Sequence, residues 1–173
     1  MNDLQTLRSQ KDDFFAQDHR SPLTHEQKHT FQGLNYFPEN PDLRFEVEVA
    51  ENIEKQVFQM QTSTGDFQSF QRFGKFSFEV NAQSAELTLY VNEHGYFLPF
   101  ADSLAGTETY GAGRYLEPER LQNGKFMVDF NLAYNPYCAY NELFSCPLTP
   151  AENRLKVPIR AGEKIFEKDE IQT

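Results

Sequence analysis

The segment Asp129–Pro150 holds the densest set of groups that could bind a ligand or take part in a reaction. It reads DFNLAYNPYCAYNELFSCPLTP, with three Asn, three Tyr and two Cys between prolines. A loop this long in a compact domain either serves a function or is held in place by its own side chains. Asn and Pro are also common turn formers, so a structural Ω-like loop is an equal alternative.

Polar side chains of differing chemistry gather on and around this loop. We predict a small-molecule site near residues 129–153. The candidate ligand-binding residues are Arg114, Asp129, Asn131, Tyr134, Asn135, Asn141 and Glu152. The planar guanidinium of Arg114 would hold an anionic group, and Asp129 would be a buried acid or an anchor for Arg114. A buried Arg–Asp pair is also common without function, so a non-catalytic structural or interaction module is the alternative, and whether the chain is an enzyme stays open.

Cys138 and Cys146 lack the CxxC spacing and the nearby His of a zinc ribbon. A disulfide across so short a loop would add only about 2 to 3 kcal/mol in the chain-entropy description. The surrounding side chains that can bury small apolar groups are Tyr134, Tyr137, Tyr140 and Phe144. We therefore predict reduced, largely buried thiols that are structural rather than nucleophilic.

Residues 25–29 match the zinc-hydrolase pattern H-E-x-x-H. On a helix this pattern places His25 and His29 on one face, with the carboxylate of Glu26 beside them. A working zinc site also needs a third protein ligand and a helix buried under a cleft. Because this helix can have at most two turns, a zinc hydrolase is the remotest of the three functional alternatives. We predict no cofactor and assign no metal ligand, while a metal stays an open possibility.

The elements that must position these residues begin with a helical N-terminal segment over residues 1–30. The apolar stripe of its first helix consists of Leu4, Leu7, Phe14 and Phe15, interrupted only by Lys11. Asn2 and Gln5 can cap its start, and the helix should end before Ser21-Pro22. Thr24 is expected to begin one further helical turn.

From Leu43 onwards the apolar period changes from 3.6 to 2, which indicates half-buried strands. The predicted strands cover residues 45–49, 58–60, 76–80, 87–91, 96–100 and 126–130. Those at 76–80 and 87–91 flank a turn and form a hairpin. No helix-length crossover separates the strands, so we predict a mainly β fold: an antiparallel meander that forms a barrel or sandwich, with a short N-terminal α-helix over an opening or an edge.

Size and composition predict a single domain over residues 1–173. The chain has 173 residues, 39% hydrophobic and 24% charged, as expected of a globular protein with one core. The antiparallel β core should span residues 43–160, and the charged tail at 165–173 is expected to fray.

The charge and the N-terminus bear on partners and location. A net charge of −10 would repel phosphate backbones, so we expect no nucleic-acid partner. The start of the chain does not resemble a signal peptide, and no run of about 18 apolar residues occurs. We therefore expect a cytoplasmic protein with no membrane association. Its oligomeric state is open.

Several motifs resemble a family of bacterial and archaeal proteins. They are TYGAGRYL at 109–116, DFNLAYNPYCAYN at 129–141, SCPLTPAENRL at 145–155 and PIRAGEK at 158–164, and KDDFF, SPL and FQGLNYF fit as well. The likeness covers nearly the whole chain, and the family is catalogued as domain of unknown function sixteen eighty-four. The resemblance implies no established activity. At 100–106, where members read FRDATSG, this chain reads FADSLAG, without the arginine and the threonine.

Overall fold

Two helices open the chain. In the computed structural model, which describes residues 2–167, α1 spans Asp3–Gln17 and α2 spans His25–Thr30. The side chain of Asn2 accepts a hydrogen bond from the backbone N–H of Gln5 at 2.8 Å, as expected for the start of α1. Thr24 and Gln27 form a reciprocal capping box at the start of α2. No helix among residues 2–167 is long and apolar enough to cross a membrane.

The described residues form two antiparallel sheets. The larger has six strands in the order β2-β4-β5-β6-β7, with β3 also paired to β4, and the smaller has three in the order β1-β9-β8. The strands are β1 (Arg44–Val47), β2 (Ala50–Glu51), β3 (Val57–Gln61), β4 (Phe67–Val80), β5 (Gln83–Asn92), β6 (Gly95–Phe100), β7 (Arg114–Leu116), β8 (Glu119–Arg120) and β9 (Phe126–Asp129). The described residues also form four short 3-10 helices: η1 (Pro41–Leu43) directly before β1, and η2 (Phe130–Leu132), η3 (Tyr137–Ala139) and η4 (Ala151–Asn153) after β9.

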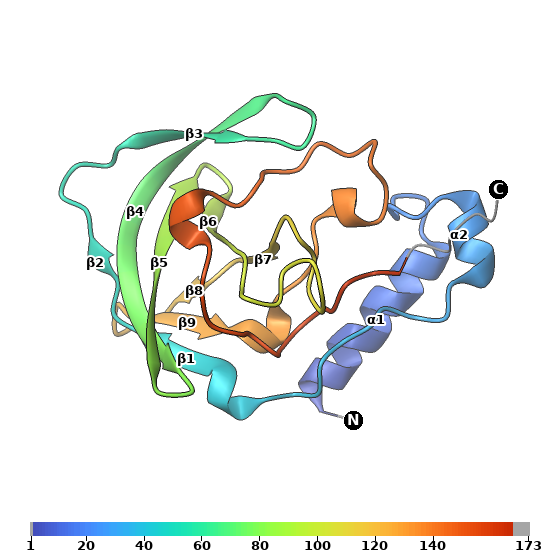
Figure 1. The fold of residues 1–173 in the computed structure, drawn as a ribbon, viewed down its shortest axis with the longest axis horizontal. Coiled ribbons are helices and arrows are strands. Elements are labelled where there is room, and N and C mark those ends of the chain that lie inside the picture. The colour runs from blue at the N-terminus through green and yellow to red at the C-terminus, as the bar shows by residue number, and fades with distance from the viewer. Residues whose placement is uncertain (1, 168–173) are drawn as a thin grey trace.

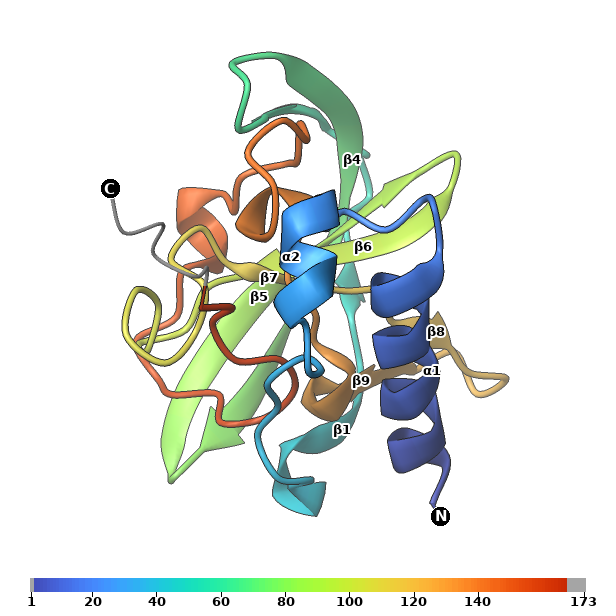
Figure 2. The ribbon, with the colours of Figure 1, turned by 90° about the vertical axis from the view of Figure 1, so that its right-hand side faces the viewer.

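The predicted fold class is confirmed: the chain is mainly β, antiparallel, with a short N-terminal helix. The two sheets are not closed into a barrel, and their arrangement is sandwich-like. Figure 1 shows β4 and β5 curving around one side, while coil segments and α1 lie on the open side. Figure 2 shows both helices in front of the sheets. The helix thus covers an opening of the sandwich.

The predicted hairpin is the pair β4 and β5. Asn81 and Ala82 form its two-residue turn with φ of 50° and 62°, the left-handed geometry that suits a tight hairpin. β4 is much longer than predicted and reaches back to Phe67, with a bulge between Arg72 and Gly74. The bulge changes the face of the strand and breaks the alternation that sequence patterns detect.

Three clusters of apolar side chains hold the elements together. The main core lies between the sheets and includes fully buried Leu87, Leu98, Phe100 and Phe130. A second cluster joins Phe15 of α1 to Leu23, Leu34 and Tyr140, and a third consists of Met60, Phe70 and Tyr90. Since α1 packs on loop residues rather than on a strand, the helix and the loop after β9 must fold together.

The end of the described chain is held in place. The backbone N–H of Ile165 donates to the carbonyl of Glu108 at 2.9 Å, and the ring of Phe166 packs on Tyr140 with 5.0 Å between centroids. Of the tail predicted to fray, residues 165–167 are described, and 168–173 lie outside the described residues.

Replacing Gly74 by Ala should destabilise the fold. A Cβ at this position would run into the backbone carbonyl of Ala50, so β2 could no longer approach β4. We expect a loss of about 1–3 kcal/mol in the free energy of unfolding, measured by urea denaturation. Gly111→Ala is the matched control, because its Cβ would lie 3.7 Å from the nearest atom, and it should change stability by less than about 0.5 kcal/mol. Equal stability of the two variants would contradict the close approach.

Candidate functional site

Arg114 is buried at the start of β7, and its guanidinium binds backbone groups of the C-terminal segment. It donates to the backbone carbonyls of Ile159, at 2.9 Å, and of Ala161 and Glu163. Its charged neighbour is Asp102, 4.0 Å away, rather than Asp129. Burial lowers the pKa of Arg114 to about 10, so the group remains charged at neutral pH. Because its two terminal nitrogens bind backbone carbonyls, the contacts of Arg114 are structural, and the side chain does not offer an open site for an anion.

Asp129 and Asn131 serve the junction between β1, β9 and the N-terminal segment. Asp129 accepts a hydrogen bond from Arg44 Nε at 2.9 Å and caps η2 through the backbone N–H of Asn131. The side-chain amide of Asn131 makes two hydrogen bonds to the backbone of Asn40, at 2.8 and 2.9 Å. The expected Arg114–Asp129 pair is therefore replaced by Arg44–Asp129 on the surface and Arg114–Asp102 in the interior.

Asn141 and Glu152 also bind within the chain. Asn141 accepts from the backbone N–H of Leu143 at 3.1 Å and so makes a turn. Glu152 accepts from Arg72 Nε at 3.0 Å and from the hydroxyl of Tyr90. Asp129 and Asn131 thus share one junction, whereas Arg114, Asn141 and Glu152 make their contacts at other places in the fold.

Asn135 belongs to a buried polar cluster around Glu163, which the sequence did not single out. The Glu163 carboxylate is 1% exposed and accepts hydrogen bonds from the backbone N–H of Asn135 at 2.7 Å and the hydroxyl of Tyr140 at 2.6 Å. It also forms an ion pair with Lys11 of α1. Burial, strengthened by the nearby Glu163 carboxylate, raises the pKa of Tyr140 well above its ordinary value. This cluster joins α1 to the loop and to the C-terminal segment.

The two histidines of the H-E-x-x-H pattern lie together on one face of α2, as predicted from their spacing. The Nε2 atoms of His25 and His29 are 3.2 Å apart, on an exposed helix of six residues. No group of three or more His, Cys, Asp or Glu side chains that could hold a metal occurs within residues 2–167. The described residues supply two of the ligands that a zinc hydrolase needs.

Cys138 and Cys146 are free and buried. The backbone N–H of Cys138 donates to Sγ of Cys146 at 3.3 Å, and the hydroxyl of Tyr110 lies 3.7 Å from Sγ of Cys138. The neighbouring Cys146 thiol lowers the pKa of Cys138 below its ordinary value, against the opposing effect of burial. In the reduced protein the sulfur of Cys146 thus lies against the backbone of Cys138.

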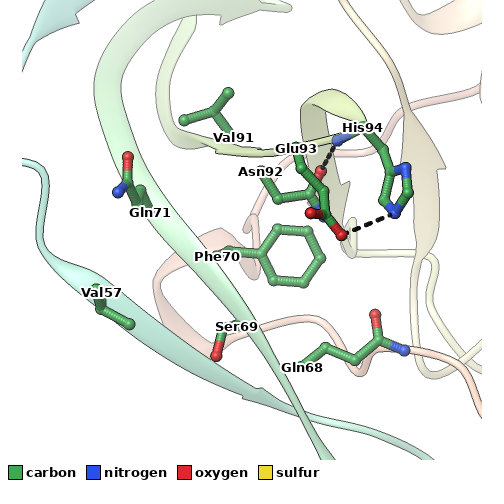
Figure 3. A pocket seen from close by; sticks show the side chains of 9 residues that line it. All are labelled: Val57, Gln68, Ser69, Phe70, Gln71, Val91, Asn92, Glu93 and His94. Atoms are coloured by element: carbon green, nitrogen blue, oxygen red, sulfur yellow. Dashed lines mark hydrogen bonds and ion pairs between the residues drawn. The ribbon is translucent and has the colours of Figure 1, made fainter.

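A spacious hollow lies elsewhere, between the β3–β4 hairpin and the turn that joins β5 to β6 (Figure 3). The last paired residues of β4 and β5 are Gln71 and Val91; beyond them β4 runs on towards Phe67 paired only with β3. The resulting groove has a volume of about 620 Å³. Its lining residues are Val57, Gln68, Ser69, Phe70, Gln71, Val91, Asn92, Glu93 and His94.

Phe70 forms the apolar part of the groove. Its ring stacks on Phe97 with 5.2 Å between centroids and 21° between planes, so its position is fixed by packing. Figure 3 shows the ring between β4 and the side chains of Glu93 and His94. These two form an ion pair at 3.4 Å when His94 is protonated, and the backbone N–H of His94 donates to Asn92.

The groove continues into a second hollow of about 350 Å³, which shares Gln68, Phe70, Asn92 and His94 with it. Tyr115 and Tyr134 line this extension, and Tyr134 donates a hydrogen bond to Glu117 at 2.6 Å. Burial and the Glu117 carboxylate both raise the pKa of Tyr134. Tyr134 is thus the predicted ligand-binding residue that lines this space.

Sequence reasoning missed most of the groove for identifiable reasons. The strands predicted at 87–91 and 96–100 imply a turn between them, but nothing in their pattern marks His94 as part of a groove. The first half of β4 is rich in glutamine and precedes a bulge, so its pattern did not predict a strand. The one available signal was Phe70 within the polar run QSFQ, an isolated aromatic that requires a packing partner.

Replacing Arg114 by Lys should destabilise the protein rather than remove a ligand contact. Lysine keeps the charge, but its single ammonium group cannot bind three carbonyls as the planar guanidinium does. We therefore expect a loss of about 2–4 kcal/mol in the free energy of unfolding. Arg160→Lys is the matched control, because Arg160 is 54% exposed and pairs with Glu108 at 3.1 Å. It should cost less than about 1 kcal/mol. Native stability of Arg114→Lys in urea denaturation would contradict this role.

Comparison with known proteins gives the chain its family. It is similar to a solved structure of an uncharacterized protein of Haloarcula marismortui, determined by solution NMR. The two chains are 36% identical with a TM-score of 0.70, over 93% of this chain and 91% of the other. No curated protein matches this chain significantly. Residues 29–164 match the model of the family described as protein of unknown function (DUF1684), and the chain belongs to this family.

Proposed function

We propose that this protein binds a small, uncharged, amphipathic molecule in the groove between the β3–β4 hairpin and the β5–β6 turn. The observation that carries the proposal is a hollow of about 620 Å³ that has a rigid aromatic ring on one side and is otherwise lined mainly by neutral polar side chains, with the Glu93–His94 pair at its edge. Ligand pockets commonly have volumes of about 300–1,000 Å³, an apolar lining and a few polar groups that fix orientation.

The chemistry of the lining supports an uncharged ligand. Gln68, Ser69, Gln71 and Asn92 can donate and accept hydrogen bonds without a net charge. Neither this groove nor its extension is lined by Lys or Arg, and the extension adds Glu117. An anion would meet carboxylates in a protein of net charge −10, so the earlier expectation of an anionic group held by Arg114 is not part of this proposal.

The proposed ligand lies away from the site predicted near residues 129–153, but small-molecule binding remains the function. The loop contributes Tyr134 and Pro147 to the extension of the groove. We further propose a cytoplasmic protein that acts without nucleic acid, membrane or bound cofactor. The proposal names no reaction.

A non-catalytic interaction module is the second candidate, and one observation favours it. Leu7 of α1 and Leu132 of η2 are 52% and 48% exposed and line the same small hollow beside α1. Two large apolar side chains exposed next to each other are typical of a surface that another protein covers.

The interaction module predicts that these two leucines mediate association. Sedimentation velocity of the wild-type protein should then show a species larger than the monomer, and the double variant Leu7→Gln/Leu132→Gln should be monomeric because the apolar surface is lost. Val57→Gln, at another exposed apolar side chain, is the control and should leave the association unchanged. A monomeric wild-type protein would count against self-association through this surface.

The groove predicts a specific pattern of small-molecule binding. In protein-detected NMR, uncharged aromatic alcohols, amides and monosaccharides should shift the amide signals of Ser69, Phe70 and Asn92. Charged analogues of similar size, such as benzoate, should not bind. Ser69→Trp would fill the groove from an exposed position and should weaken binding by at least about tenfold, or about 1.4 kcal/mol. Ser77→Trp, exposed on the same strand but away from the groove, should bind as the wild type does. Equal binding by the two variants, or no binding by any compound of the panel, would overturn the proposal.

A further inference from the structure

Cys138 and Cys146 are the two cysteines of the chain, and the fold places the sulfur of Cys146 against the backbone of Cys138. Cys138 lies in η3, and Cys146 lies in the extended segment that follows. The backbone N–H of Cys138 donates to Sγ of Cys146 at 3.3 Å. Two cysteines placed this closely meet the basic requirement for a disulfide, which needs the sulfur atoms to reach a bonding distance of about 2 Å.

We propose that Cys138 and Cys146 form a redox-active dithiol, in which Cys138 reacts with hydroperoxides and Cys146 converts the product to an intramolecular disulfide. The thiolate of Cys138 attacks one oxygen of the hydroperoxide, the O–O bond breaks, and Cys138 becomes a sulfenic acid while an alcohol or water leaves with a proton. The sulfur of Cys146 then attacks Sγ of Cys138; the S–O bond breaks, the S–S bond forms, and water carries away the remaining proton. The hydroperoxide is reduced and the two thiols are oxidised.

Hydrogen-bond donors around Cys138 support its role as the nucleophile. The hydroxyl of Tyr110 lies 3.7 Å from Sγ of Cys138. The neighbouring Cys146 thiol and this hydroxyl favour the thiolate, so the pKa of Cys138 lies below its ordinary value in spite of burial. Thiolates are the reactive form towards peroxides, so this environment differs from that of an inert buried thiol.

The cover over the thiols is thin. Cys138 is 5% exposed and Cys146 8%, so both lie just beneath the surface. The segment between them projects outward, with Leu143 88% exposed, and a turn at Asn141 shapes it. A hydroperoxide the size of hydrogen peroxide needs only a small displacement of this segment to reach Sγ of Cys138.

Oxidation of the two thiols would also affect the β3–β4 hairpin. The backbone N–H of Ser63 donates to the carbonyl of Cys146 at 2.9 Å, and the backbone N–H of Cys146 donates to Oγ of Ser63 at 3.1 Å. A shift of Cys146 towards Cys138 therefore acts on the turn that ends β3 and begins β4. Amide signals of Ser63 and Thr64 report on the state of the dithiol.

The test uses the full-length protein, reduced and freed of reductant, with hydrogen peroxide as the probe. Intact-mass measurement after alkylation should show a monomer that has lost two hydrogen atoms and takes up no alkylating reagent, and a dithiol reductant should restore both thiols. Cys146→Ser should accumulate a sulfenic acid at Cys138 that a dione reagent traps. Cys138→Ser should react at least about tenfold more slowly.

Controls separate chemistry from folding. Cys138→Ser/Cys146→Ser is the blank, and Tyr110→Phe keeps both thiols while removing one donor, so it should be oxidised more slowly with an unchanged NMR spectrum elsewhere. The proposal is overturned if the wild-type protein keeps two alkylatable thiols under conditions that oxidise free cysteine in the same tube. It is also overturned if only intermolecular disulfides form, or if Cys138→Ser loses its thiol as fast as the wild-type protein.

Discussion

The extended C-terminal segment Ile159–Lys164 belongs to neither sheet, and two buried charged side chains fix it. The guanidinium of Arg114 binds three of its backbone carbonyls, and the carboxylate of Glu163 returns from the segment to Lys11, Asn135 and Tyr140. Removing one partner of a buried charge leaves the other uncompensated, at a cost of several kcal/mol. Helix α1, the loop after β9 and the chain end must therefore adopt their positions together.

This constraint explains why most polar side chains of the loop after β9 are bound within the protein. The loop has no strand partner over most of its length, so its amides and carboxylates must satisfy backbone groups that a sheet would otherwise pair. Asn131 binds the backbone of Asn40, Asn135 binds that of Lys164, and Asn141 closes a turn. Side chains bound in this way have fewer groups left for a ligand, which favours placing the proposed ligand at the open end of the larger sheet.

The sequence predicted those features that depend on local pattern. Strands of about four or more residues with a clean period of 2 were found, as were both helix caps and the turn of the β4–β5 hairpin. β2, β7 and β8 have two or three residues each, too few to show a period. The buried polar cluster around Glu163 could not be predicted because it depends on long-range geometry. Lys11 interrupts the apolar stripe of the first helix, and its partner, Glu163, is 152 residues away in the sequence.

The loop after β9 and the groove lie far apart in the sequence, but hydrogen bonds connect them. Beyond Gln71 the β3–β4 hairpin loses β5 as a neighbour, and its tip is supported instead by residues 144–148, through Leu148 to Gln61 at 2.8 Å and Cys146 to Ser63. A two-stranded hairpin alone is marginally stable, so this support determines how the wall of the groove is held. In the proposed binding mode the loop therefore acts through the position of the hairpin as well as through Tyr134, and a change in the bonding of Cys146 would be transmitted to the same wall.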